Sequence, residues 1–173
     1  MKIIKDYLRL IVFSVGLLVG VQLPAVVDQY AKRVDAKLLE SQQNLAGFQQ
    51  TAERYFAGDI KKLVAHYLAS DDVVFKQDAN NIQFIVQRVA LLAEELELLQ
   101  QGALIGTFHV VFKHDDAIMR ETLAQYTYVL ILQPSALLWG ITIALSLSIL
   151  IELIFTALFS AIRRMNRPNK VQI

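Results

Sequence analysis

Few residues in this chain carry side chains that could perform acid–base or metal chemistry. His66, His109 and His114 are the only histidines, and there is no cysteine, which excludes disulfides, thiol catalysis and cysteine-ligated zinc. His109 and His114 are five residues apart. On a helix they would point about 140° away from each other, which is poor geometry for one metal ion. A periplasmic enzyme would require His66, His114 and a carboxylate to converge in a cleft.

Two acidic clusters have simpler structural explanations. The cluster at residues 114–116 stands at an expected helix start, where an aspartate caps free backbone N–H groups and favours the helix dipole. The second cluster cannot place its three carboxylates on one helix face, so a solvated face is expected for Glu94, Glu95 and Glu97.

Motifs for enzymatic chemistry are missing from the sequence. No glycine-rich phosphate loop precedes a helix, and neither an HExxH zinc motif nor a GxSxG nucleophile elbow occurs. The formal net charge of +1 gives no reason to expect a nucleic-acid partner. We therefore predict that the protein is not an enzyme and has no catalytic residue, no cofactor and no metal ligand.

The polar residue that most needs an explanation is Glu152. It is the only formally charged residue of the apolar stretch 139–162, which is long enough to cross about 30 Å of hydrocarbon. Leucine, isoleucine and phenylalanine side chains in this stretch contribute roughly −4 to −7 kcal/mol to insertion, against about +2.5 to +3.5 kcal/mol for a central carboxylate. The net free energy of inserting this stretch into a membrane is therefore favourable. Glu152 is expected to be protonated or hydrogen-bonded, and to face the first span or a second copy of the chain.

Small and polar residues recur every four positions along the same stretch. Such a stripe drifts by about 40° per step and suits close contact between helices. The residues of the stripe are Gly140, Ala144, Ser148, Glu152, Thr156 and Ser160. In the first apolar segment, Gly16 and Gly20 form a GxxxG motif. We expect these two glycines to lie at a depth similar to that of Glu152 and to pack against the stripe.

The first apolar segment covers residues 10–27 and is interpreted as an uncleaved span; a cleavable signal peptide is the alternative. Basic residues precede the first span and follow the second. They are Lys2, Lys5 and Arg9 before the first, and Arg163, Arg164, Arg167 and Lys170 after the second. Residues 28–134 carry ten lysines and arginines against fourteen aspartates and glutamates, a formal charge of −4. The positive-inside rule then predicts cytoplasmic termini and a periplasmic central segment.

Helical periodicity dominates the central segment. One apolar stripe has spacings of three and four and consists of Tyr30, Val34, Leu38, Ser41, Leu45, Phe48, Ala52 and Tyr55. Gly58 is expected to end this helix and Asp59 to cap a short one. Residues 70–81 look like a loop, and a second long helix is expected over residues 82–99. Gly102 and Gly106 break the helical pattern after it, and a further helix is expected over about 115–132. Two long helices with matching stripes predict an antiparallel helical hairpin of coiled-coil type.

The predicted fold is therefore all-α and integral to a membrane, with two transmembrane helices flanking a periplasmic antiparallel helical hairpin. The predicted boundaries are a cytoplasmic N-terminus at 1–9, a span at 10–27, the hairpin at 28–134, a span at 135–162 and a basic cytoplasmic tail at 163–173. The first span is expected to run on into the long outer helix, with a bend near Pro24.

Several segments together resemble a bacterial family without an assigned function, domain of unknown function family 2937. The segments, in chain order, are LPAVVDQY, LAGFQQTAERY, LVAHYLASDDVVF and a second span with Glu152 ahead of a basic tail. The resemblance covers nearly the whole chain. It implies a two-span inner-membrane protein of proteobacteria and supplies no catalytic residue, cofactor or substrate.

The predicted function is a non-catalytic accessory or interaction protein anchored in the bacterial inner membrane by two spans. Its expected partners are the lipid bilayer and either a second copy of the chain or another membrane or periplasmic protein. The alternative is a subunit of a small oligomeric transport or ion-conducting assembly that uses Glu152. Such an assembly would need several copies, because two helices cannot enclose a pore.

Overall fold

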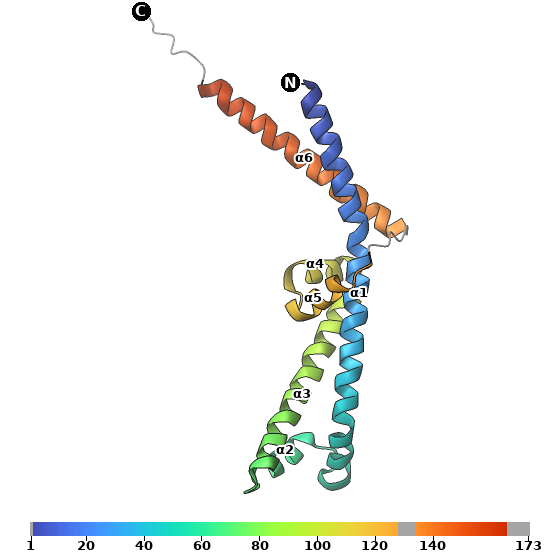
Figure 1. Ribbon diagram of the computed structural model, residues 1–173, viewed down its shortest axis with the longest axis vertical. Coiled ribbons are helices and arrows are strands. Elements are labelled where there is room, and N and C mark those ends of the chain that lie inside the picture. The colour runs from blue at the N-terminus through green and yellow to red at the C-terminus, as the bar shows by residue number, and fades with distance from the viewer. Residues whose placement is uncertain (1, 128–133, 166–173) are drawn as a thin grey trace, which may run out of the picture. The chain divides into compact units, whose positions relative to one another are not determined.

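The computed structural model describes residues 2–127 and 134–165, and within these ranges the chain forms six helices and no strand. Figure 1 shows them in chain order. They are α1 (Lys2–Phe56), α2 (Ile60–Leu68), α3 (Val73–Gln100), α4 (Ala103–Lys113), α5 (Asp116–Ala124) and α6 (Pro134–Met165). The prediction of an all-α protein is confirmed for the described part of the chain.

The chain divides into two compact units, and α1 contributes to both. One unit, called here the span unit, contains Met1–Ala25 and Thr127–Ile173, and the other, the helical unit, contains Val26–Tyr126. Helix α1 continues through Pro24 without a break, as the predicted run-on of the first apolar segment requires. Two helices are long and apolar enough to cross a membrane, one within Asp6–Phe56 and the other covering Ala136–Ala157.

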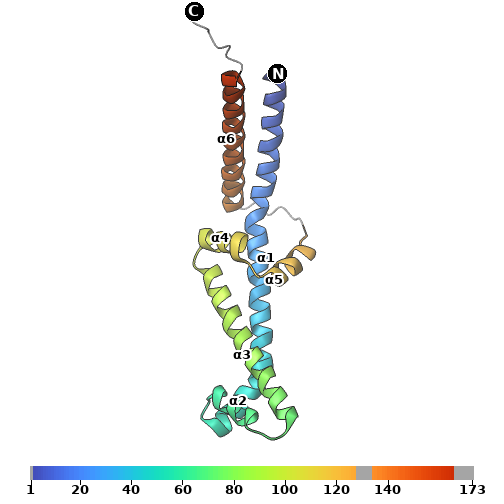
Figure 2. The same cartoon turned by 90° about the vertical axis from the view of Figure 1, so that its left-hand side faces the viewer.

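In the helical unit, α1 and α3 run antiparallel and share two clusters of apolar side chains (Figures 1 and 2). The first cluster, called here the Tyr30 cluster, joins α1, α3, α4 and α5 through Tyr30, Val34, Leu38, Leu92, Val110 and Ile118. The second joins α2 and α3 through Val64, Ala79 and Ile82, with Leu45 and Phe48 of α1 packed against them. The start of the α1 stripe packs against the end of the α3 stripe, and the end of the α1 stripe packs against the start of the α3 stripe. The two predicted stripes therefore face each other in antiparallel order.

Aspartate side chains start three of the helices in the helical unit. Asp59 accepts from the backbone N–H groups of residues 61 and 62 and starts α2, as the sequence predicts. Asp115 does the same for residues 117 and 118 and starts α5, which confirms the structural interpretation of the acidic cluster there. Asp72 accepts from the N–H of Val74, so α3 begins at Val73 and the predicted loop over residues 70–81 is wrong from residue 73 onward.

Three further sequence expectations need correction. Gly106 does not break a helix but lies buried inside α4, where a β-carbon would come within 2.9 Å of the Leu99 carbonyl oxygen, so the glycine allows α4 to approach α3. Gly102, with φ of +136°, makes the turn alone. The helix expected over residues 115–132 ends at Ala124, and residues 128–132 of that expectation lie outside the described residues. Tyr55 is not part of the buried stripe, since it is 69% exposed near the end of α1.

Candidate functional site

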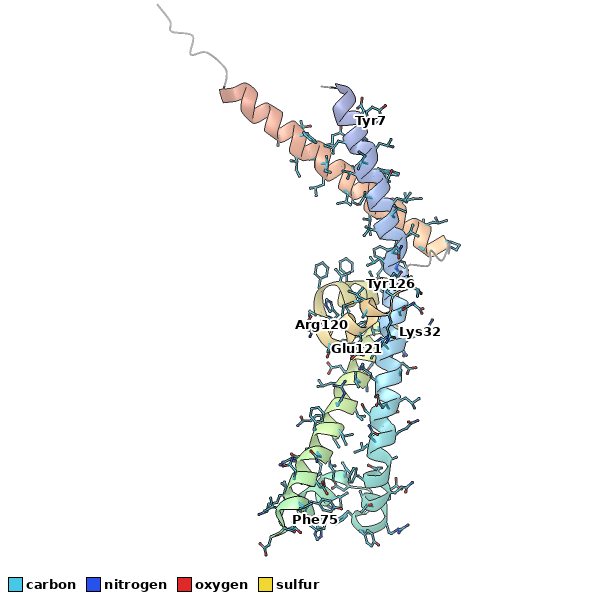
Figure 3. The ribbon with its side chains drawn as sticks, viewed as in Figure 1. Tyr7, Lys32, Phe75, Arg120, Glu121 and Tyr126 are labelled. Atoms are coloured by element: carbon cyan, nitrogen blue, oxygen red, sulfur yellow. The ribbon has the colours of Figure 1, made fainter. Side chains whose placement is uncertain are left out.

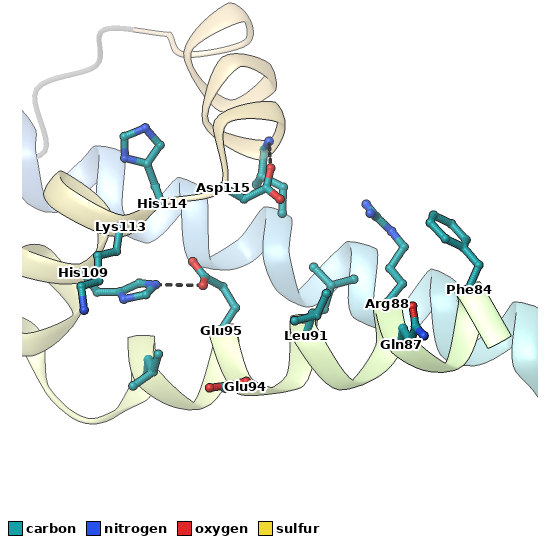
Figure 4. A pocket seen from close by; sticks show the side chains of 13 residues that line it. Phe84, Gln87, Arg88, Leu91, Glu94, Glu95, His109, Lys113, His114 and Asp115 are labelled. Atoms are coloured by element: carbon teal, nitrogen blue, oxygen red, sulfur yellow. Dashed lines mark hydrogen bonds and ion pairs between the residues drawn. The ribbon is translucent and has the colours of Figure 1, made fainter. Parts of the chain in front are cut away.

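Three helices of the helical unit meet at the carboxylate of Glu95, and the start of a fourth is joined to them through Tyr30. The Tyr30 hydroxyl of α1 donates to Glu95 Oε1 at 2.7 Å, and Nε2 of His109 in α4 lies 2.8 Å from Glu95 Oε2. The backbone N–H of Asp115, just before α5, donates in turn to the Tyr30 oxygen at 2.8 Å. Figure 4 shows the contact between His109 and Glu95. We call these four residues the Glu95 network.

Each polar atom of this network has a fixed role. A carboxylate only accepts hydrogen bonds, so Nε2 of His109 carries a proton toward Glu95. Burial and the hydrogen bond to Glu95 raise the pKa of the Tyr30 hydroxyl above its usual value, so the hydroxyl stays protonated and keeps donating. Both carboxylate oxygens and the Tyr30 hydroxyl are therefore engaged in holding helices together, which favours a structural role over general-base chemistry.

A pocket of about 450 Å³ opens beside the Glu95 network (Figure 4). Its apolar lining includes Leu91, Leu98 and Ile118, and both histidines of this region reach it. Charged side chains of both signs surround it, namely Arg88, Glu94, Glu95, Lys113 and Asp115. An apolar wall with a few polar or charged groups is the common composition of a concave binding site.

The three histidines have separate hydrogen-bond and ring contacts. Nδ1 of His114 lies 2.6 Å from the Val110 carbonyl oxygen, and its other nitrogen is 3.5 Å from Asp116. His66 lies elsewhere, with its ring 5.5 Å from that of Phe56. No group of three or more candidate metal ligands occurs among the described residues. His66 and His114 therefore do not converge, although His109 and His114 line one pocket from their separate positions.

A second polar contact ties α5 to α1. Lys37 Nζ lies 2.9 Å and Arg33 Nη1 3.5 Å from Glu121, and Arg33 also donates to the Gln125 side chain at 2.7 Å. Figure 3 labels Glu121 on α5, close to α1. The hydrogen bond from Lys37, with the charges of both cations, lowers the pKa of the Glu121 carboxyl. The C-terminal end of α5 is thereby fixed about two turns of α1 beyond Val26.

In the span unit, α1 and α6 meet through their small residues. A β-carbon on Gly20 would lie 2.7 Å from the Cα of Gly140, and one on Gly16 would lie 3.1 Å from the Cα of Ala144. Ser148, one step further along the predicted stripe, is also buried. The structure thus brings five of the six proposed packing residues to one contact.

The sixth residue, Glu152, lies at a different level. Its carboxylate is 3.5 Å from Nη1 of Arg9, and both side chains are more than half exposed. The predicted depth shared with Gly16 and Gly20 is wrong, because those glycines face residues 144 and 140. After three steps of about 40° the stripe has rotated roughly 120° from Gly140, so Glu152 and Thr156 leave the packed face. Ser160 lies outside the residues whose side chains are described.

A smaller hollow of about 170 Å³ adjoins this ion pair. Its polar lining comes from both helices of the span unit and comprises Asp6, Arg9, Ser148, Glu152 and Thr156. Among the described residues, the buried hydroxyl of Ser148 has no hydrogen-bond partner. A buried hydroxyl normally finds one, so water is a natural occupant of this hollow.

Comparison with known families assigns the chain to one family. A family model described as "Protein of unknown function (DUF2937)" matches residues 4–164. The chain belongs to this family. The match includes both apolar helices and the entire helical unit, and it confirms the resemblance noted from the sequence. No curated protein and no solved structure matches the chain significantly.

The Glu95 network is the functional feature that sequence reasoning missed. Glu95 and His109 are separated by the Gly102 turn, and Tyr30 is 65 residues from Glu95. The one available signal was the position of Glu95, which falls between Leu92 and Leu96 of the predicted inward stripe. A carboxylate beside a buried stripe requires a partner, and that requirement distinguishes it from Glu94 and Glu97.

Proposed function

We propose that this protein is a non-catalytic interaction protein of the bacterial inner membrane, anchored by two spans. Both termini are cytoplasmic, and the helical unit is a periplasmic antiparallel hairpin that presents its pocket to a protein partner. The observation that carries the proposal is the pocket itself: an apolar wall is open to solvent, while the polar groups beside it are used to join helices.

The charge distribution and the span contact support the membrane part of this proposal. The flanking charges follow the positive-inside pattern, and two apolar helices pair through glycines, as membrane helices commonly do. The contact between Glu152 and Arg9 gives the intramembrane carboxylate a partner within the chain. Arg9 precedes the apolar segment, so Glu152 lies near the cytoplasmic edge of the span, where an ion pair is less costly.

Affinity purification of the full-length protein from native membranes tests the interaction role. Leu91 lines the pocket and Val74 does not, yet both side chains are 67% exposed. Leu91→Glu should remove a co-purifying protein that Val74→Glu retains. Identical sets of co-purifying proteins for the wild type and both variants would contradict the proposal that the pocket is the binding surface.

The hollow beside Ser148 favours a second candidate, an oligomeric assembly that conducts protons or cations with Glu152 as its polar group. Vesicles containing wild-type protein should then leak protons or a cation, and Glu152→Gln should abolish the leak. A strict monomer in detergent and in lipid, or equal leak rates for both proteins, would exclude this candidate.

A further inference from the structure

Helix α4 exposes an apolar face that nothing in the described part of the chain covers. Five large apolar side chains are between 43% and 72% exposed there, which is unusual for one short helix of a folded unit. They are Leu104, Ile105, Phe108, Val111 and Phe112. The rings of Phe108 and Phe112 stack with their centroids 6.0 Å apart, so the face is continuous along the helix. We call it the α4 apolar face.

The opposite side of α4 already has its own packing partners. Gly106, Thr107 and Val110 are buried, and Val110 belongs to the Tyr30 cluster. At 100° per residue, the centre of the exposed group lies roughly 155° around the helix from the centre of the buried group. Helix α4 therefore presents one apolar side to the protein and another away from it, and Lys113 at its end is its only lysine or arginine.

The helical unit places α4 at the end where its chain enters and leaves. Val27, the last residue of the predicted first span, packs against the Tyr30 cluster to which α4 contributes Val110. The other boundary of the unit follows α5, whose neighbour Gln125 is held by Arg33. The chain thus enters the unit at Val26 and leaves it about two turns of α1 further on, and the Tyr30 cluster connects this end of the unit to α4.

We propose that the α4 apolar face lies in the periplasmic surface of the lipid bilayer, with its side chains at the boundary of headgroups and acyl chains. This rests on the proposed two-span function. An eleven-residue helix is too short to span the hydrocarbon and has a suitable length to lie along its surface. Lys113 can extend its ammonium group to lipid phosphates while its aliphatic part stays in the interface.

Lipid explains this face better than a second copy of the chain does. Val27 packs against the Tyr30 cluster, and Val110 of α4 belongs to that cluster, so a membrane surface at the level of Val27 would lie close to α4. Exposed apolar residues at the other end of the helical unit, such as Val73 and Val74, have no such relation to a chain exit.

Spin labelling of the full-length protein tests the proposal, and a cysteine-free chain needs no background substitutions. Single variants Phe108→Cys, Phe112→Cys, Val74→Cys and Leu145→Cys carry a nitroxide in phosphatidylethanolamine–phosphatidylglycerol vesicles. Molecular oxygen concentrates in the bilayer and a nickel chelate stays in water. Labels at 108 and 112 should collide with oxygen several-fold more often than with nickel, as a label at 145 does, and a label at 74 should show the reverse.

The control at Leu145, in the second apolar helix, separates the two proposals. Nickel access at 108 and 112 together with oxygen access at 145 overturns the surface position of α4 and leaves the two-span anchor intact. Nickel access at 145 overturns the anchor itself and the α4 inference with it. Shielding of 108 and 112 from both reagents, with disulfide-linked dimers of Phe112→Cys on oxidation, shows a second copy on this face and also overturns the inference.

Discussion

Gly20 and Gly140 lie in direct backbone contact: a β-carbon added to Gly20 would be 2.7 Å from the Cα of Gly140 and 2.9 Å from the carbonyl oxygen of Trp139. Ordinary contacts between carbon atoms are about 3.5–4.0 Å long, so the two helices would have to separate by roughly 1 Å. The close approach of α1 and α6 therefore depends on glycine at these positions.

Gly20→Ala should lower the stability of the full-length protein by about 1–3 kcal/mol, since the added methyl meets backbone atoms that cannot rotate away. Equilibrium unfolding in mixtures of mild detergent and SDS measures this. Gly47→Ala is the matched control. It has open space around the new methyl group, so it should be neutral or stabilising by up to about 1 kcal/mol. Equal effects of the two substitutions would contradict the helix contact.

Tyr30→Phe should destabilise the helical unit by about 1–3 kcal/mol, because it leaves one oxygen of Glu95 and the N–H of Asp115 without their partner. Thermal unfolding of the detergent-solubilised protein, followed by circular dichroism, gives the change in Tm. Tyr55→Phe removes the same hydroxyl from a side chain that is 69% exposed and should leave the Tm unchanged. A Tyr30→Phe protein as stable as the wild type would show that the Glu95 network is dispensable.

Acidification should weaken the contact between α5 and α1. The pKa of Glu121 is lowered in the folded protein, so its contribution to stability is complete above the usual glutamate pKa and disappears as pH falls through the lower, folded value. Glu121→Gln should therefore reduce the loss of stability below about pH 4. The control is Glu53→Gln, at an exposed position of α1, which should keep the wild-type acid dependence. Identical acid curves for both variants would refute this role of Glu121.

The ion pair in the span unit predicts non-additive substitutions. Glu152→Leu or Arg9→Leu alone leaves the other charge without its partner, whereas the double substitution removes both. A double-mutant cycle on unfolding in detergent–SDS mixtures should give a coupling energy above about 0.5 kcal/mol. A coupling energy of zero would show that the two side chains do not stabilise each other.

Local patterns in the sequence were sufficient for much of the fold. The apolar stripes of α1 and α3 predicted their facing sides, and Asp59 marked the start of α2, because helix periodicity and capping depend on neighbouring residues. The start of α3 was missed because polar residues between 76 and 81 looked like a loop, although Asp72 supplies a cap and Ala79 is buried. Gly106 was wrongly predicted to break a helix, because a glycine is needed there for close contact with Leu99 of another helix, which no local pattern shows.

The candidate site depended on contacts that no local pattern contains. Tyr30 reaches Asp115 across 85 residues, and Glu95 acquires its partners only when α4 folds back after Gly102. In the span unit, the spacing of small residues was visible in the sequence. The register of α1 against α6 was not visible in the sequence. That register places Glu152 beside Arg9, whereas Gly16 lies beside Ala144.

The Glu95 network has a further consequence for assembly in the membrane. It joins Tyr30 to Asp115 across 85 residues, within a unit whose two ends continue into the apolar helices. Holding the ends of a flexible segment of this length together costs roughly 4 kcal/mol of chain entropy. In a folded helical unit this entropy is already lost before the two apolar helices pair. In the proposed two-span topology, folding of the helical unit therefore raises the effective concentration of one apolar helix for the other, and Tyr30→Phe should weaken their pairing without altering a single residue at their contact.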